Sequence, residues 1–220
     1  MSKALQTRPK AIIFDWDNTL VDSWSIIQDA LNATFVEYGI APWSLIETKA
    51  RVAKSLRDSF PELFGDAWEA AGKVFYGHFE AIHLDRLTPL PGAAEMLAEL
   101  SKLDIYLGVV SNKTGKLLRA EAQKLGWGKH FGHIIGAMDA PRDKPATDPV
   151  TMALQGSGIE PGPHVWFAGD ARIDMECALN SGCTPVLVRA EPPTNGEFTG
   201  ADPALYLDTP LGLSNLAKNL

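Results

Sequence analysis

The sequence predicts an α/β fold in which a doubly wound parallel sheet carries an inserted helical unit. Short apolar runs alternate with helical patterns along most of the chain, as expected for parallel strands that are buried on both faces. One long stretch breaks this alternation and shows helical patterns only. The chain has 220 residues, of which 45% are hydrophobic, which is enough for a core domain and a smaller partner domain.

Five short apolar runs are the predicted strands. Each is bounded by Gly, Asp, Asn or Pro, which commonly end strands and begin turns. The runs cover residues 11–14, 105–110, 134–137, 165–168 and 186–188. In a doubly wound fold, functional groups gather at the carboxyl ends of the strands. The residues that directly follow each run are therefore the first candidates for a functional site.

Helical patterns fill the spaces between these runs. Pro91 is suited to the first turn of one helix, and Gly126 is suited to the end of the next. The expected apolar faces are Ala93, Met96, Leu97, Leu100 and Leu103 in the first helix, and Leu117, Leu118, Ala122 and Leu125 in the second. Residues 191–200 are rich in Pro, Gly and Thr and predict a surface loop, and the last residues predict a short helix.

Residues 23–87 contain no convincing strand pattern and are predicted to form a helical cap. Residues 29–37 and 67–81 suit helices, and aromatic residues are frequent throughout this stretch. Such aromatic side chains usually pack into a small core of their own. We therefore expect a core domain of residues 1–22 and 88–220 and a helical cap of residues 23–87, which is either an inserted bundle with its own small core or, in addition, a lid over the strand ends.

Charge and composition argue against several classes of protein. The net charge of −7 disfavours a nucleic-acid-binding protein, which usually carries a basic face. No apolar run approaches the length of a membrane span, and the first ten residues lack the apolar segment of a signal peptide, so we expect a cytoplasmic protein without membrane contact. Cys177 and Cys183 form no C-x-x-C pair and have no matching histidine cluster, which favours core residues over a zinc or disulfide site.

Asp15, Asp17 and Thr19 directly follow the first predicted strand. Side chains alternate along an extended chain, so the carboxylates of Asp15 and Asp17 start out on the same side. Two carboxylates that close repel each other unless a cation lies between them, and a hard divalent ion such as Mg²⁺ suits their oxygens. A polar turn is the ordinary alternative, but a D-x-D-x-T pattern after a buried strand favours metal chemistry.

Three further polar sites follow other predicted strands or begin helices. Ser111 and Asn112 could hold a phosphate oxygen together with free backbone N–H groups, although Ser and Asn are also ordinary helix caps. Lys144 is either a solvated surface charge or a cation that neutralises a phosphoryl group near a carboxylate. Asp170 and Asp174 lie one helical turn apart. They are either acids that cap a helix or, if the pair of Asp15 and Asp17 lies beside them, metal ligands.

Taken together, these sites resemble the motifs of the haloacid dehalogenase-like superfamily. Its four motifs are D-x-D-x-T, a Ser or Thr, a Lys, and G-D-x-x-x-D. The segment 15–19, Ser111, Lys144 and the segment 169–174 match them in order. The segment FDWDNTLVDS at residues 14–23 closely resembles the start of the phosphoglycolate phosphatase-like branch. The resemblance covers nearly the whole chain, including the position of the helical cap, and implies a Rossmann-like core.

The resemblance implies a role for each of these residues. Asp15 would be the nucleophile that forms an aspartyl-phosphate, and Asp17 would be the general acid and then the base that activates water. The phosphate would be oriented and bound by Thr19, Ser111, Asn112 and Lys144. Mg²⁺ would be held by Asp15, the backbone carbonyl of Asp17 and Asp170, with Asp174 bound directly or through water. Asn18 stands where the family most often has Gly, and Asn tolerates unusual backbone angles.

Substrate choice is expected to depend on the cap. It carries four cations at spacings that could place several on one helical face, Lys49, Arg51, Lys54 and Arg57. Our hypothesis is that Arg51 or Lys54 reaches an anionic leaving group, and the alternative is that all four are solvated surface charges.

The leading functional hypothesis is a Mg²⁺-dependent phosphatase that acts on a small phosphorylated metabolite, as a monomer or a homodimer. A phosphosugar mutase of the same superfamily, or a non-catalytic protein that binds such a metabolite, is the alternative. A dehalogenase is disfavoured, because that branch needs no metal and does not use the second acid, which is present here as Asp17.

Overall fold

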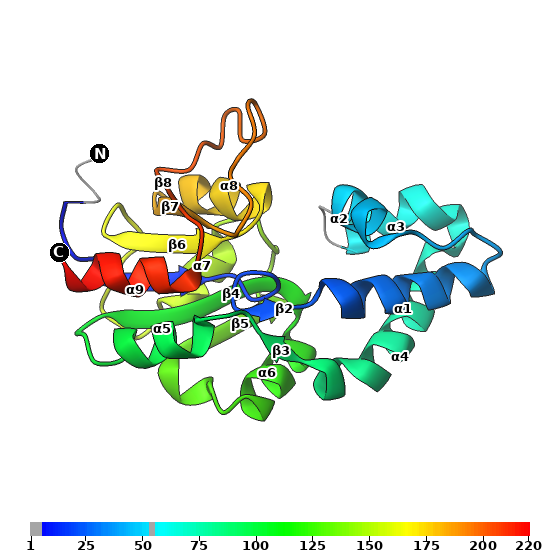
Figure 1. The fold of residues 1–220 in the computed structure, drawn as a ribbon, viewed down its shortest axis with the longest axis horizontal. Helices are drawn as coiled ribbons and strands as arrows, with labels where there is room; N and C mark the ends of the chain where they lie inside the picture. The colour runs from blue at the N-terminus through cyan, green and yellow to red at the C-terminus, as the bar shows by residue number, and fades with distance from the viewer. Residues whose placement is uncertain (1–5, 53–55) are drawn as a thin grey trace. The chain divides into compact units, whose positions relative to one another are not determined.

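The computed structural model describes residues 6–52 and 56–220 and divides the chain into two compact units (Figure 1). The first, which we call the core unit, comprises the residues up to Val21 together with Pro89–Leu220. The second, which we call the cap unit, comprises Asp22–Thr88. Each boundary therefore lies one residue from the position expected from the sequence.

A six-stranded sheet forms the centre of the core unit, and all of its strand pairs are parallel. The strand order is β5-β4-β1-β6-β7-β8. The strands are β1 (Ala11–Phe14), β4 (Tyr106–Thr114), β5 (His133–Ala137), β6 (Val165–Gly169), β7 (Thr184–Val188) and β8 (Leu205–Leu207). The five apolar runs are all found among these strands, and the predicted fold class is confirmed.

Strand β1 lies in the middle of the sheet and positions the site. All four of its residues are buried, because neighbouring strands pair with it on both sides and the sheet is covered on both faces. The chain runs from β1 through β4 to β5 on one side and through β6 to β8 on the other. The strand order therefore reverses at β1, and in open parallel sheets such a reversal creates a crevice at the carboxyl ends of the strands.

In the described part of the core unit the α-helices are α5 (Ala93–Leu100), α6 (Gly115–Lys124), α7 (Asp148–Ala153), α8 (Arg172–Asn180) and α9 (Pro210–Lys218). Helices α7 and α8 cover one face of the sheet, where Val150 and Cys177 pack in one cluster with Ile13 and Phe167. Helices α5 and α9 lie side by side (Figure 1). As expected, α6 ends just before Gly126, whose φ is +67°, and α9 forms the C-terminal helix.

Some elements differ from the expectation. Helix α5 begins at Ala93 rather than Pro91, because Gly92 precedes it at a left-handed φ of 83°, and Leu103 lies beyond its end. Strand β4 continues to Thr114, four residues past the predicted end at Val110. Two short strands, β2 (Val21–Asp22) and β3 (Thr88–Pro89), pair where the chain passes between the units.

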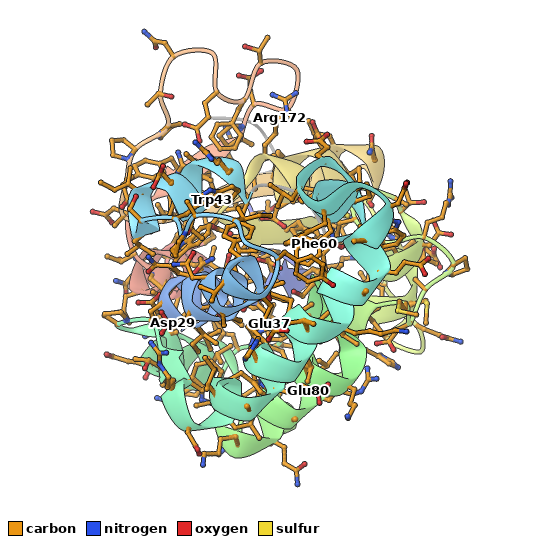
Figure 2. All side chains as sticks on the ribbon, turned by 90° about the vertical axis from the view of Figure 1, so that its right-hand side faces the viewer. Asp29, Glu37, Trp43, Phe60, Glu80 and Arg172 are labelled. Carbon is orange, nitrogen blue, oxygen red and sulfur yellow. The ribbon has the colours of Figure 1, made fainter. Side chains whose placement is uncertain are left out.

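The cap unit contains α1 (Trp24–Glu37), α2 (Leu45–Arg51), α3 (Leu56–Phe64) and α4 (Trp68–Arg86), and a short 3₁₀ turn links α3 to α4. Its core is aromatic, as expected, and Phe35 and Phe60 are at its buried centre. Trp43 packs edge-on against Phe35, with ring centroids 4.7 Å apart. Figure 2 labels Trp43 and Phe60. Among the described residues, no helix combines the length and the apolar character that a membrane crossing requires.

Ion pairs join the two long helices of the cap unit. Arg86 in α4 pairs with Asp29 in α1, and His78 in α4 contacts Glu37 in α1 at 2.9 Å. Asp29 and Glu37 lie along α1 in Figure 2. Because these side chains are partly exposed, the pairs contribute little next to the aromatic core.

Candidate active site

The segment after β1 turns sharply and brings Asp15 to the end of the sheet. Asp15 continues the strand pairing, since its N–H donates to the carbonyl of Ala168 at 2.9 Å. Two residues after Trp16 the chain reverses at Asn18, whose φ is 61° and whose N–H donates to Val21 at 2.7 Å. A left-handed φ favours Gly or Asn, so the tolerance expected of Asn18 is confirmed.

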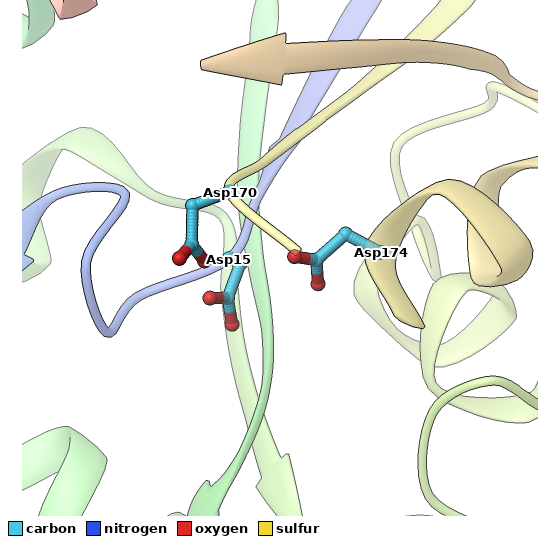
Figure 3. Close-up of side chains that lie close together, drawn as sticks. All are labelled: Asp15, Asp170 and Asp174. Atoms are coloured by element: carbon cyan, nitrogen blue, oxygen red, sulfur yellow. The ribbon is translucent and has the colours of Figure 1, made fainter. Parts of the chain in front are cut away.

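Three carboxylates converge at this end of the sheet (Figure 3). Asp15 follows β1, Asp170 follows β6, and Asp174 lies in the first turn of α8. One ligand oxygen from each of the three side chains lies within 4.8 Å of the others, and Asp15 and Asp174 are buried. These residues were predicted as metal ligands, and the fold brings all three together.

Gly169 allows this close approach. A Cβ at position 169 would overlap the side chain of Asp174, so any larger residue would push that carboxylate away. The Asp174 carboxylate is also oriented by the backbone, since its Oδ2 accepts the Ala171 N–H at 3.0 Å. Asp174 therefore caps its helix and faces the other two carboxylates at the same time.

Lys144 is the cation of this cluster. Its Nζ donates to Asp15 Oδ1 at 2.6 Å and to Asp174 Oδ1 at 2.7 Å, and its side chain is only 3% exposed. Burial alone would lower its pKa, but the two carboxylates more than offset this and raise it. Lys144 therefore stays charged, and the alternative of a solvated surface lysine is excluded.

Two of the carboxyl groups are strongly perturbed. Burial raises the pKa of Asp15 to about 7; the Lys144 ammonium lowers it in part, and Asp174 raises it further. Desolvation and the carboxylates of Asp174 and Asp15 raise the pKa of Asp170 well above its usual range. A divalent cation bound between such carboxyl groups stabilises their ionised forms, which burial and mutual repulsion otherwise disfavour. The donor set therefore fits a hard cation that prefers oxygen ligands.

Ser111 and Asn112 lie inside β4 rather than at the start of a helix. The pairing of β4 with β5 shifts register between Val110 and Thr114, and the residue preceding α6 is Thr114, so neither Ser111 nor Asn112 caps that helix. Ser111 is 5% exposed, and its Oγ accepts the N–H of Lys113 at 3.2 Å.

The side chain of Asn112 is engaged with the backbone of Lys144. Its Oδ1 accepts the Lys144 N–H at 3.0 Å, and its Nδ2 donates to the Lys144 carbonyl at 3.2 Å. The phosphate contact suggested by the sequence stays a prediction, whereas this clamp is directly visible. It fixes the loop that carries Lys144 to the end of β4.

Thr19 is buried, at 1% exposed, and its hydroxyl has no hydrogen-bond partner within the described part of the chain. An unsatisfied buried hydroxyl is costly, so this atom is available to a bound group.

The side chain of Asp17 is not among the three clustered carboxylates and pairs instead with Lys113, which was not predicted from the sequence. Lys113 Nζ donates to Asp17 Oδ1 at 2.6 Å and to both carboxylate oxygens of Glu121. Burial would lower the Lys113 pKa, but Asp17 and Glu121 raise it instead. The signal for Glu121 was its position: it is a charged residue one turn after Leu117, on the predicted apolar face of α6.

Two arginines hold the loop at residues 191–200, which contains no helix or strand, as expected. Arg189 pairs with Glu197 at 2.8 Å and donates to the carbonyl of Asp170 at 3.3 Å. Arg172, labelled in Figure 2, donates to the carbonyls of Glu197 and Thr199. The loop is thereby tied to the segment that carries Asp170.

The cap cations are only partly described. The guanidinium of Arg51 lies over the ring of Trp43, 4.6 Å from its centroid, and 3.9 Å from Glu47. Lys54 lies outside the described residues. The hypothesis that Arg51 or Lys54 selects the substrate therefore stays a prediction.

Comparison with known proteins agrees with this geometry. Residues 12–188 match the model of the haloacid dehalogenase-like hydrolase family. The chain belongs to the haloacid dehalogenase-like hydrolase family. It is thus an enzyme of the hydrolase class, and the family predicted from the four motifs is confirmed.

Relatives within this haloacid dehalogenase-like family extend over most of the chain. A phosphoglycolate phosphatase from Chromobacterium violaceum is 29% identical over 188 residues, 81% of this chain and 84% of the relative. An N-acetylmuramic acid 6-phosphate phosphatase from Pseudomonas aeruginosa is 27% identical over 203 residues, 89% of each chain. A haloacid dehalogenase-like hydrolase from Streptococcus pneumoniae has a similar structure, with a TM-score of 0.84, 24% identity, and coverage of 96% of this chain and 99% of the other.

Proposed function

We propose that this chain is a Mg²⁺-dependent phosphatase that hydrolyses a small phosphate monoester through an aspartyl-phosphate on Asp15. The relatives described above are named phosphatases, which supports hydrolysis of phosphate esters. The observation that carries the proposal is the buried cluster of Asp15, Asp170 and Asp174 beside Lys144, at the reversal point of the sheet.

In this proposal Asp15 is the nucleophile. One of its carboxylate oxygens attacks phosphorus, and the bond from phosphorus to the ester oxygen breaks. Lys144, which contacts both Asp15 and Asp174, attracts the phosphoryl oxygens and offsets their charge near the nucleophile. We assign the buried hydroxyls of Ser111 and Thr19 to the rest of the phosphate site, and their burial and their places in the sequence motifs support this.

Asp17 moves the protons. Its carboxyl gives a proton to the departing alcohol oxygen, and its carboxylate then takes a proton from the water that attacks the aspartyl-phosphate. The phosphorus–oxygen bond to Asp15 breaks in this second step, which releases inorganic phosphate and restores the carboxylate.

Mg²⁺ would be held by Asp15, Asp170 and Asp174 and by the backbone carbonyl of Asp17. When bound, it offsets the repulsion between the anionic nucleophile and the anionic phosphate. The raised pKa values of Asp15 and Asp170 support this assignment, because burial and the neighbouring carboxylates raise both in spite of Lys144, and a bound divalent cation would favour the ionised forms.

A panel of phosphate esters tests the proposal. The wild type should release inorganic phosphate from one or more small esters with Mg²⁺ and lose this activity with a chelator. The panel includes phosphoglycolate and a sugar 6-phosphate, the substrate types that appear in the names of the relatives.

Asp15→Asn is the decisive variant. We expect its turnover to fall by at least 10³-fold, because the amide is a poor nucleophile. Undiminished turnover in Asp15→Asn would contradict the mechanism. Isomerisation of a sugar phosphate without phosphate release would instead indicate a mutase.

A further inference from the structure

A buried ion-pair network lies beside Asp17, and the reaction proposed above does not use it. Glu121 in α6 is 0% exposed, and a carboxylate so deeply buried is costly unless it is paired. Its two oxygens accept from Lys113 Nζ at 2.8 and 2.7 Å. One of them also accepts the indole N–H of Trp16 at 2.7 Å. Glu121 therefore holds both Lys113 and the residue between Asp15 and Asp17.

Lys113 extends this network to Asp17. Its side chain is 6% exposed, and its Nζ donates to Asp17 Oδ1 at 2.6 Å as well as to Glu121. Three segments are thus joined through one ammonium group: the turn after β1, the irregular end of β4, and α6. Trp16 is fixed further by Trp127, which meets it edge-on with ring centroids 5.8 Å apart.

We propose that Lys113 and Glu121 are positioning residues for Asp17. Lys113 donates to Oδ1 and holds the Asp17 carboxyl group so that its other oxygen carries the proton to the leaving oxygen, and Glu121 holds Lys113 and Trp16. This inference rests on the acid–base role of Asp17 proposed above.

The physical reason is the freedom of an aspartate in a turn. The Asp17 side chain is 21% exposed and has two rotatable bonds, so loss of the Lys113 ion pair would let its carboxylate sample more directions. Proton donation requires hydrogen-bond distance to the leaving oxygen, and a displacement of about 1 Å can cost about 10²-fold in rate. A lysine anchored by a second, buried carboxylate limits those directions.

Two substrates with different leaving groups provide the test. If Lys113 and Glu121 were purely structural, their loss would change kcat/KM for both substrates alike. An alkyl alcohol leaves as a poor alkoxide unless it is protonated, whereas p-nitrophenolate needs little assistance. The ratio kcat/KM reports the steps up to loss of the alcohol. Loss of Asp17 alignment should therefore lower kcat/KM for an alkyl phosphate much more than for p-nitrophenyl phosphate.

The test variant removes both charges of the pair. Lys113→Met alone would take the Lys113 ammonium away from the buried Glu121 carboxylate, so it is combined with Glu121→Gln, which removes the negative charge and keeps an acceptor for the Trp16 indole. We expect kcat/KM to fall about 10- to 100-fold for the alkyl phosphate found active in the panel and less than about 3-fold for p-nitrophenyl phosphate. Circular dichroism verifies that the variant is folded. Lys116→Met, at an exposed lysine early in α6, is the matched control and should change kcat/KM for neither substrate.

Should the double variant not fold, Glu121→Gln alone supplies the test. It keeps Lys113 and an acceptor for Trp16 and weakens only the anchor. We expect a smaller fall in kcat/KM than in the double variant, and again mainly for the alkyl phosphate. An equal loss on both substrates would overturn the inference.

Asp17→Asn separates failure of this inference from failure of the proposed function. If Asp17→Asn loses the alkyl phosphate selectively and the double variant does not, the inference alone is overturned. If Asp17→Asn shows no selectivity, the acid role of Asp17 falls, and the inference falls with it. In the Asp17→Asn background the double variant should cause no further loss. A further loss of the same size would indicate that Lys113 acts directly on substrate.

Discussion

Asp15 has to be ionised to act as a nucleophile, yet its surroundings favour the protonated form. Burial is the main cause of its raised pKa of about 7, and Asp174 adds to it against the opposing effect of Lys144. In an unfolded chain the pKa of Asp is about 3.9. Between these values the folded protein keeps a proton that the unfolded chain has released. The contribution of Asp15 to stability therefore falls as pH rises from about 4 to about 7.

We expect the chelator-treated protein to have a lower free energy of unfolding at pH 8 than at pH 5. Asp170, whose pKa is also raised by desolvation and by Asp174, contributes in the same direction. Asp15→Asn removes one of the two titrating groups and should reduce the difference between the two pH values by up to a few kcal/mol. Urea unfolding of wild type and variant at both pH values measures this. An identical pH dependence in the variant would contradict the assigned pKa.

At the scale of elements, the end of β4 and the loop before α7 are joined by the Asn112 amide, which binds the backbone of Lys144 on both sides. Asn112→Ala should destabilise the protein by about 1–3 kcal/mol, since a buried N–H and a carbonyl lose their partner. We also expect kcat to fall about 10-fold, because Lys144 would no longer be held against Asp15.

A matched control for this clamp contacts the same loop from the end of helix α8. The exposed Asn180 donates to the carbonyl of Pro145 at 2.9 Å, so Asn180→Ala removes a similar amide-to-backbone bond outside the site. It should change stability by less than about 1 kcal/mol and leave kcat unchanged. Equal effects of the two variants would show that the Asn112 clamp has no special role.

The helix α2 of the cap unit carries the candidate specificity residue Arg51. Its guanidinium stacks on Trp43, which orders it, and its ion pair with Glu47 at 3.9 Å is exposed and weak. Arg51→Ala should raise KM for the natural ester several-fold and spare p-nitrophenyl phosphate. Lys49→Ala, on the same helix, is the control and should change neither KM. Equal losses of Arg51→Ala on both substrates would count against a role in specificity.

Elements with a long periodic or apolar pattern could be predicted from the sequence, and those that depend on distant partners could not. The run at Ala11–Phe14 is continuous and buried, so its strand was evident. Strand β8 is only three residues long, and β2 and β3 have two residues each, too few to show a period. Their existence depends on neighbours brought together by the fold.

The same distinction applies to the site. Asp15, Asp170 and Asp174 follow predicted strands, so topology alone indicated that they would meet. The network of Lys113 and Glu121 was missed, because a lysine after a strand and a glutamate in a helix are individually ordinary. Only the burial of Glu121 on an apolar face distinguishes it, and burial depends on the final packing of α6.

At the scale of the whole molecule, the three clustered carboxylates and Lys144 all belong to the core unit, which has its own sheet and its own buried cluster. The chain leaves and re-enters this unit through β2 and β3, which pair with each other. Paired strands lie about 4.8 Å apart, so a short turn could join them without distortion. The cation site should therefore not depend on the cap unit.

Replacing residues 24–86 with a short Gly-containing turn tests this division. We expect the shortened protein to unfold cooperatively and Mg²⁺ at about 100 times its Kd to stabilise it by about 2.7 kcal/mol, as it would the full chain. Hydrolysis of p-nitrophenyl phosphate should persist, while discrimination among natural esters is lost, because specificity is proposed to lie in the cap. Thermal unfolding with and without Mg²⁺ and the ester panel measure both effects. Loss of the Mg²⁺ stabilisation in a folded core would show that the cap contributes to the cation site, whereas retained discrimination would place substrate choice in the core.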